Sequence, residues 1–97
     1  MKLVYSRRAL TDLDDIAAYY TASASPFIAS AIGRRLEDVI NRICRIPEAA
    51  PRVSQRSQVR VVAVVRYPFR IFYRVREGRI DILHIRHTSR RPLGGVD

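Results

Sequence analysis

The sequence predicts an α+β fold, a helical hairpin packed on a small antiparallel sheet in the order β-α-α-β-β-β. Apolar residues recur every three or four positions over residues 7–23 and 26–45, which is the period of one helix face. Three β-prone runs follow at residues 59–65, 69–76 and 79–87. Helices with one apolar side must bury it on another layer, so we expect the hairpin to cover one face of the sheet.

Length and composition indicate one domain. The chain has 97 residues, enough for one hydrophobic core, so we expect a single domain over residues 1–97. No stretch approaches the roughly 18 apolar residues that a membrane-spanning helix needs. The N-terminal segment contains too short an apolar run for a secretory signal. We therefore expect a cytoplasmic protein with no membrane partner.

The N-terminal half is expected to form one strand and two helices. Residues 2–5 are a short β-prone start, and Ser6 suits the N-cap of the first helix. The second helix begins after Ser25 with Pro26 at its first position, where proline is favoured, and Pro47 ends it. The apolar stripe of the first helix contains Leu10, Leu13, Ile16, Ala17 and Tyr20. That of the second contains Ile28, Ala31, Ile32, Leu36, Val39, Ile40 and Ile43.

Three aspartates in the first helix, Asp12, Asp14 and Asp15, oppose the positive end of its macrodipole, so a structural role is expected for them. No nearby histidine or cysteine completes a metal-ligand set. The chain has no P-loop, no GxGxxG, no CxxC and no serine elbow. We therefore expect neither a metal nor a cofactor.

The C-terminal half is expected to form a loop and three strands. Residues 47–58 contain two prolines and no periodicity, as in a surface loop. Residues 59–65 are rich in valine with apolar residues on both faces, as in an interior strand. Glu77 and Gly78 separate the last two strands, a tight turn with glycine where a positive φ is needed.

This turn predicts the pairing of the last two strands. A two-residue turn pairs Arg76 with Arg79 and, four residues further on, Phe72 with Leu83, and paired residues share a face. The face toward the helices is expected to contain Phe69, Ile71, Tyr73, Val75, Ile80, Ile82 and His84. The opposite face is expected to contain Arg70, Phe72, Arg74, Arg76, Asp81, Leu83, Ile85 and His87.

The second face combines arginines with apolar residues, and three interpretations of this combination are open. On nucleic acid, arginines neutralise phosphates while Phe72 offers a stacking platform. Alternatively Phe72, Leu83 and Ile85 form a second, minor core with the arginines extending from its rim, or a protein partner buries them. The candidate residues for binding a target or partner are Arg70, Phe72, Arg74, Arg76, Leu83, Ile85 and Arg86.

Charge is concentrated in the C-terminal half. The chain has 18 Lys and Arg against 9 Asp and Glu, a net charge of +9, and Lys2 is its only lysine. Residues 1–50 hold seven cations and six acids, whereas residues 51–97 hold eleven arginines and three acids. Arginine presents a planar fork of donors that matches phosphate and carboxylate. We therefore expect a polyanionic or acidic partner, and not charge that only keeps the protein soluble.

The two histidines are expected to lie on opposite faces. His84 lies toward the core in this pairing, which favours a hydrogen-bonded structural role. His87 ends the last strand on the basic face, near Arg70 and Arg90. A histidine beside phosphate-binding arginines is a minimal acid–base site for RNA cleavage, in which the 2′-hydroxyl attacks the adjacent phosphate. The same three residues would serve equally well to bind an acidic partner.

Two segments of the sequence resemble a known protein family. The segment SRRALTDLDDIAAYY (6–20) resembles the opening helix of ParE-type toxins. The segment YPFRIFYRVREGRIDILHIRHTSR (67–90) resembles the hairpin and strand end shared across the ParE/RelE superfamily. The resemblance implies an acidic antitoxin that wraps the toxin and represses their shared operon, so that operator DNA is contacted only through the antitoxin.

The resemblance divides on function. Resemblance to ParE implies growth inhibition by poisoning DNA gyrase without a catalytic site, and the DLDDI run favours this branch. Resemblance to RelE implies messenger RNA cleavage on the ribosome, for which His87, Arg70 and Arg90 are the candidate catalytic residues. The lysines that some RelE-like nucleases use are missing here. We expect the toxin of a type II toxin–antitoxin (plasmid stabilisation) system that acts on gyrase, with ribosome-dependent cleavage as the first alternative and a non-toxic nucleic-acid-binding module as the second.

Overall fold

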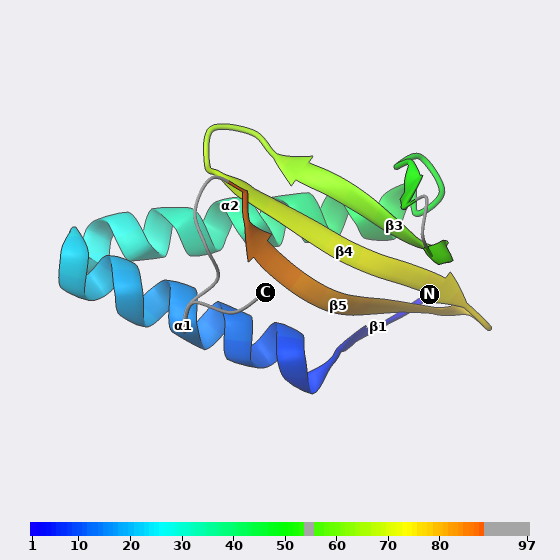
Figure 1. Ribbon diagram of the computed structural model, residues 1–97, viewed down its shortest axis with the longest axis horizontal. Coiled ribbons are helices and arrows are strands. Elements are labelled where there is room, and N and C mark those ends of the chain that lie inside the picture. The colour runs from blue at the N-terminus through cyan, green and yellow to red at the C-terminus, as the bar shows by residue number, and fades with distance from the viewer. Residues whose placement is uncertain (54–55, 89–97) are drawn as a thin grey trace.

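The computed structural model describes residues 1–53 and 56–88, and it contains two helices and five strands (Figure 1). In chain order these are β1 Lys2–Tyr5, α1 Arg7–Ser23, α2 Pro26–Arg45, β2 Arg52–Val53, β3 Arg56–Val64, β4 Phe69–Arg76 and β5 Arg79–His87. The strands form one sheet in the order β1-β5-β4-β3-β2. The helical hairpin packs on one side of this sheet, which confirms the α+β fold class expected from the sequence.

The sheet is mixed and not purely antiparallel. The pairs β5 with β4, β4 with β3 and β3 with β2 are antiparallel, whereas β1 pairs with β5 in parallel. Two helices separate β1 from β3, and such a crossover returns the chain to the sheet in its original direction. Two further reversals then bring β5 into that same direction beside β1. The two-residue strand β2 lies in the segment expected to be a loop, and β3 begins at Arg56 and not at residue 59.

Serine caps start both helices. The Ser6 hydroxyl oxygen accepts a hydrogen bond from the Ala9 amide at 2.9 Å, and the Ser25 hydroxyl oxygen accepts one from the Ile28 amide at 3.1 Å. Each bond satisfies an amide that has no partner within the helix. Pro26 takes the first position of α2, as its fixed φ favours.

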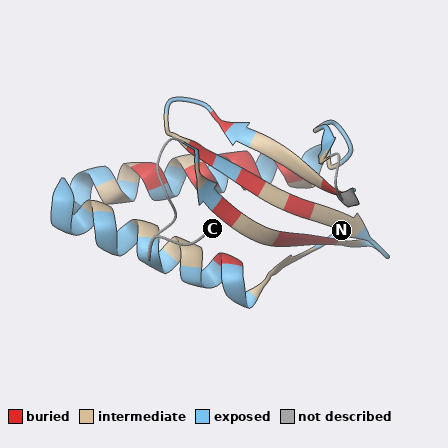
Figure 2. Cartoon of the chain, viewed as in Figure 1, coloured by how far each residue is buried: buried red, intermediate tan, exposed pale blue. Residues whose placement is uncertain are grey.

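The core lies between α2 and the helix-facing side of the sheet. The largest fully buried side chains are Tyr73, Phe69, Ile32, Leu36, Ile71, Ile80 and Ile82. Figure 2 shows buried and more exposed residues alternating along β4, as expected for a strand with one covered face. Within the described residues no helix is long and apolar enough to cross a membrane.

Helix α1 contributes less to the core than its apolar stripe predicts. It contacts mainly α2 and β5 and so lies along the side of the sheet. Ala9 is its only buried residue, and Leu13, Ile16 and Tyr20 are partly buried against the core. Leu10 is 52% exposed, so its expected place in the core is wrong. The first turn of α2 is also exposed, at Phe27 and Ile28.

The hairpin pairing follows the prediction near the turn and departs from it further away. Arg76 pairs with Arg79, and the expected register continues as far as Tyr73 with Ile82. An extra residue then enters β5, so that Phe72 pairs with His84 and not with Leu83. This β-bulge shifts the remaining pairs, and a shift of one residue moves every later side chain to the other face.

Candidate functional site

The side of the sheet away from the helices carries a row of arginines. Because Phe69, Ile71 and Tyr73 of β4 are buried in the core, the residues between them face the other way. Their partners on β5 share that face. We call this surface the outer face and define it by Arg70, Phe72, Arg74, Arg76, Arg79, Asp81, His84 and Arg86.

One buried carboxylate organises three of these arginines. Asp81 is only 6% exposed. Its oxygens lie 2.8 Å from Nε of Arg79, 3.4 Å from Nε of Arg74 and 3.8 Å from Nε of Arg76. A buried carboxylate needs such pairing, because desolvation without a partner would be costly. The cluster nevertheless retains a positive charge, since three guanidinium groups surround one carboxylate.

The rest of the outer face combines charge with aromatic surface. Arg70 and Arg86 are paired across the two strands, and both are exposed. The ring of Phe72 stacks on the imidazole of His84, with centroids 5.8 Å apart and planes 19° from parallel. Phe72 and His84 are half-buried, so a partner that covers this face would meet both rings.

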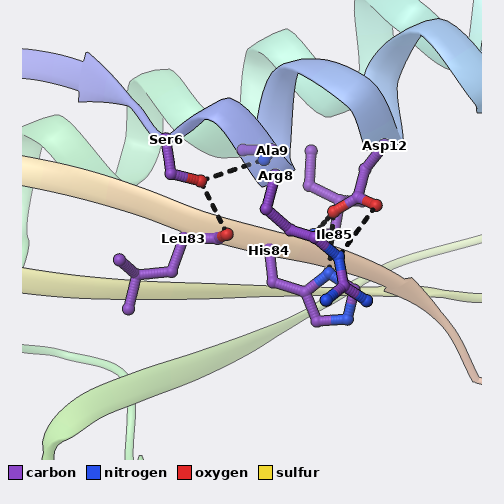
Figure 3. Close-up of polar contacts among 7 residues, drawn as sticks. All are labelled: Ser6, Arg8, Ala9, Asp12, Leu83, His84 and Ile85. Carbon is purple, nitrogen blue, oxygen red and sulfur yellow. Dashed lines mark hydrogen bonds and ion pairs between the residues drawn. The ribbon is translucent and has the colours of Figure 1, made fainter. Parts of the chain in front are cut away.

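Helix α1 holds His84 in place (Figure 3). Strand β1 ends at Tyr5, and beyond it the edge of β5 is satisfied by the N-cap residue of α1 and by one side chain of the helix itself. The Ser6 hydroxyl donates to the Leu83 carbonyl at 2.8 Å, and Oδ2 of Asp12 accepts from the Ile85 amide at 2.9 Å. The same Oδ2 lies 2.7 Å from Nδ1 of His84. Asp12 therefore both satisfies the bulged strand and orients the imidazole.

The structure separates the residues expected for a nuclease. The bulge places His87 opposite Phe69, with which it makes an edge-to-face ring contact at 5.4 Å, on the helix side of the sheet. Arg70 is the neighbour of Phe69 and lies on the outer face. The expectation that His87 shares the basic face is therefore wrong. Arg90 lies outside the described residues.

Of the two apolar β5 residues of the expected binding face, Ile85 changes place and Leu83 keeps its side. Ile85 is 3% exposed and belongs to the core, so its assignment to the binding face is wrong for the same reason. Leu83 is the extra residue of the bulge and is half-buried. Figure 3 shows Leu83 and His84 extending to one side of β5 and Ile85 to the other. The remaining expected residues, Arg70, Phe72, Arg74, Arg76 and Arg86, lie together on the outer face.

His84 is the outer-face residue that strict alternation assigned to the wrong side. The signal for its true place is in the sequence, because alternation beyond Ile82 would bury His84 and expose Ile85. An extra residue at Leu83 reverses both placements and costs less free energy, because it buries the isoleucine instead of the histidine. Within the described residues no group of three or more histidine, cysteine or acidic side chains could hold a metal ion.

Comparison with known proteins identifies the family. Residues 3–92 match the family model described as the ParE toxin of the type II toxin–antitoxin system, parDE. No curated protein matches the chain. The chain is similar to a solved structure described as the chromosomal ParDE TA system from P. aeruginosa, with 28% identity, a TM-score of 0.72, and coverage of 92% of this chain and 97% of that one.

A second solved structure has the same fold. It is described as a YoeB/ParE toxin from Agrobacterium tumefaciens, and it has 18% identity, a TM-score of 0.67, and coverage of 92% of this chain and 100% of that one. The family model covers most of the chain, and the first structure agrees with it in both fold and sequence. The chain therefore belongs to the ParE toxin family of type II toxin–antitoxin systems.

Proposed function

We propose that this protein is a cytoplasmic toxin that stops growth by poisoning DNA gyrase and is neutralised by an acidic antitoxin. The placement of His87 and Arg70 on opposite sides of the sheet carries the choice of target. An acid–base group and a phosphate-binding arginine must contact the same phosphate to cleave RNA. With these two residues separated, the outer face is better suited to binding a macromolecule than to cutting one.

The composition of the outer face supports a binding role. Arg70, Arg76 and Arg86 are exposed, and Phe72 offers aromatic surface between them. Arginine and aromatic side chains dominate the binding energy of many protein interfaces. A partner with acidic side chains would pair with the guanidinium groups and cover the Phe72 ring.

One observation favours ribosome-dependent RNA cleavage as a second candidate. His84 lies on the outer face with Arg70 and Arg86, and Asp12 holds its Nδ1. A histidine whose ring is oriented by a carboxylate is a common form of general base. In this second candidate His84, and not His87, would be the acid–base group.

Two assays distinguish the candidates. Expression of the protein in bacteria without an antitoxin should stop growth. Unchanged growth would contradict both toxin candidates and favour a non-toxic nucleic-acid-binding module. Purified protein should then inhibit gyrase in a supercoiling assay and leave messenger RNA intact in a translating extract. Cuts in the RNA that disappear in a His84→Ala variant would establish the second candidate instead.

The double variant Arg70→Gln/Arg86→Gln tests whether the outer face contacts the target. Each hydrogen bond to a charged group contributes about 1.5–3 kcal/mol, so we expect at least a roughly tenfold loss of gyrase inhibition. The matched control is Arg7→Gln/Arg34→Gln, which removes the same charge from exposed positions on the helices. Equal losses in the two double variants would mean that net charge acts, and not this face.

A further inference from the structure

Two hollows adjoin at the end of α2, and one of them reaches Arg76 at the end of the outer face. One has a volume of about 300 Å³ and is apolar, lined by Arg42, Ile43, Ile46, Ala49, Ala50, Val62 and Tyr73. The other has a volume of about 600 Å³ and is polar, lined by Glu48, Arg52, Gln58, Arg60, Val75 and Arg76. They adjoin because one turn, residues 46–50, lines both of them.

Three hydrogen bonds from two side chains of the sheet hold this turn in place. The Tyr73 hydroxyl donates to the Pro47 carbonyl at 2.6 Å. Nη1 of Arg60 donates to the carbonyls of Ala50 at 2.7 Å and Glu48 at 3.1 Å. Arg60 and Tyr73 are paired across β3 and β4, so all three bonds come from the same level of the sheet. The hollows are therefore part of the folded structure and need no rearrangement to form.

Charge at this site is mainly positive. Among the described residues that line the two hollows, four are arginines and one is acidic. The Glu48 carboxylate belongs to an exposed residue, whereas Arg60 is half-buried and anchored. Ile46 lines the apolar hollow and is 54% exposed. The site thus combines an apolar recess with an adjoining arginine cleft.

We infer that these hollows bind an acidic peptide segment, with an apolar side chain in the recess beside Ile46 and carboxylates against Arg52, Arg60 and Arg76. Charge complementarity selects this occupant. An apolar recess alone would accept any apolar segment, whereas the arginine cleft disfavours a basic one. The inference rests on the proposed function, which requires an acidic antitoxin as the partner. It places a contact of that partner at the end of α2, next to Arg76 of the outer face, in addition to any contact with the rest of that face.

A fluorescently labelled peptide of alternating glutamate and leucine provides the probe. Binding to the full chain is measured by anisotropy. We expect Ile46→Ser to weaken binding about tenfold through lost apolar burial. We expect Arg52→Gln to weaken it about fivefold and to reduce its salt dependence. Versions of the peptide with glutamine for glutamate, or serine for leucine, should each bind more weakly.

Matched variants keep the test specific. Val65→Ser removes an apolar side chain of similar exposure, 59%, elsewhere on the surface, and Arg34→Gln removes an exposed arginine elsewhere on α2. Both should bind the peptide like the unaltered protein. Ala49→Glu adds a negative charge at an exposed lining position without disturbing the core, and it should weaken binding even if Ile46→Ser is poorly folded.

Three results would overturn the inference. The first is that the peptide does not bind, and the second is that Ile46→Ser and Val65→Ser weaken its binding equally. The third is that a poly-uridine oligonucleotide displaces the peptide and itself binds more weakly to Arg52→Gln. The last would assign the cleft to RNA. Growth arrest and gyrase inhibition do not involve the peptide, so a toxic protein that fails to bind it would contradict this inference and leave the proposed function intact.

Discussion

At the scale of single residues, Asp12 connects the helical layer to the sheet. Its Oδ2 accepts one hydrogen bond from the Ile85 amide and lies 2.7 Å from Nδ1 of His84. Its Oδ1 lies 3.6 Å from Nε of Arg8. The Ile85 amide is at the free edge of β5, where β1 has ended. Without Asp12 this amide would face the helix with no acceptor, so one carboxylate compensates for the shortness of a strand.

We predict that Asp12→Ala destabilises the protein by about 1–3 kcal/mol, the usual effect of leaving a buried donor unsatisfied. Denaturant unfolding at neutral pH measures the change. Asp15→Ala is the control, because Asp15 is exposed on the same helix and its loss alters charge and helix propensity equally. If the two variants were equally stable, the bonds of Asp12 would contribute nothing net.

At the scale of elements, the turn between β4 and β5 limits the stability of the hairpin. Both of its central residues have positive φ, 51° at Glu77 and 72° at Gly78, as in a type I′ turn. Glycine adopts this region freely, whereas a residue with a long side chain is strained there by about 1–2 kcal/mol. Asparagine tolerates the same conformation better.

The variant Glu77→Asn should therefore stabilise the protein, by up to about 1 kcal/mol, and Gly78→Ala should destabilise it by a similar amount. Thermal unfolding of the two variants beside the unaltered protein gives the comparison. Glu77 is exposed, and the φ angle is the reason for the expected gain. A destabilised Glu77→Asn would show that the Glu77 side chain makes a favourable interaction that outweighs the strain.

The same hairpin shows how far sequence reasoning extends. Local rules predicted the turn, the order of the elements and the pairing from Arg76–Arg79 to Tyr73–Ile82, because all of these depend on neighbouring residues. The bulge at Leu83 depends on Ser6 and Asp12, which bind β5 from a helix more than seventy residues earlier. The local sequence indicates the bulge only through the cost of burying His84 and exposing Ile85, and regular alternation overlooks that cost. The arginines of β4 were therefore placed correctly and the residues beyond the bulge were not.

At the scale of the whole molecule, Tyr73 lies in the core between the two layers and Tyr5 packs against it. Burial raises the pKa of the Tyr5 hydroxyl, and the charges of Cys44 and Glu37 add to the increase. Burial also raises the pKa of Tyr73, although the neighbouring Arg60 guanidinium acts in the opposite direction. Tyr73 is 1% exposed and donates to the Pro47 carbonyl, so its ionised form would lose that bond.

These shifts predict alkaline destabilisation. A group whose pKa is higher in the folded state keeps its full contribution to stability below its unfolded pKa, here 10.0, and loses that contribution as the pH rises through the folded value. Urea unfolding between about pH 9 and pH 12 should therefore show stability falling with pH. Tyr73→Phe lowers stability at every pH by removing the bond to Pro47, but its curve should fall less steeply, and Tyr5→Phe/Tyr73→Phe should be flatter still. Tyr19→Phe, at a 38% exposed position, is the control for removing a tyrosine hydroxyl elsewhere in the fold. If the double variant kept the original slope, ionisation of groups other than these two tyrosines would be responsible for the loss of the fold at high pH.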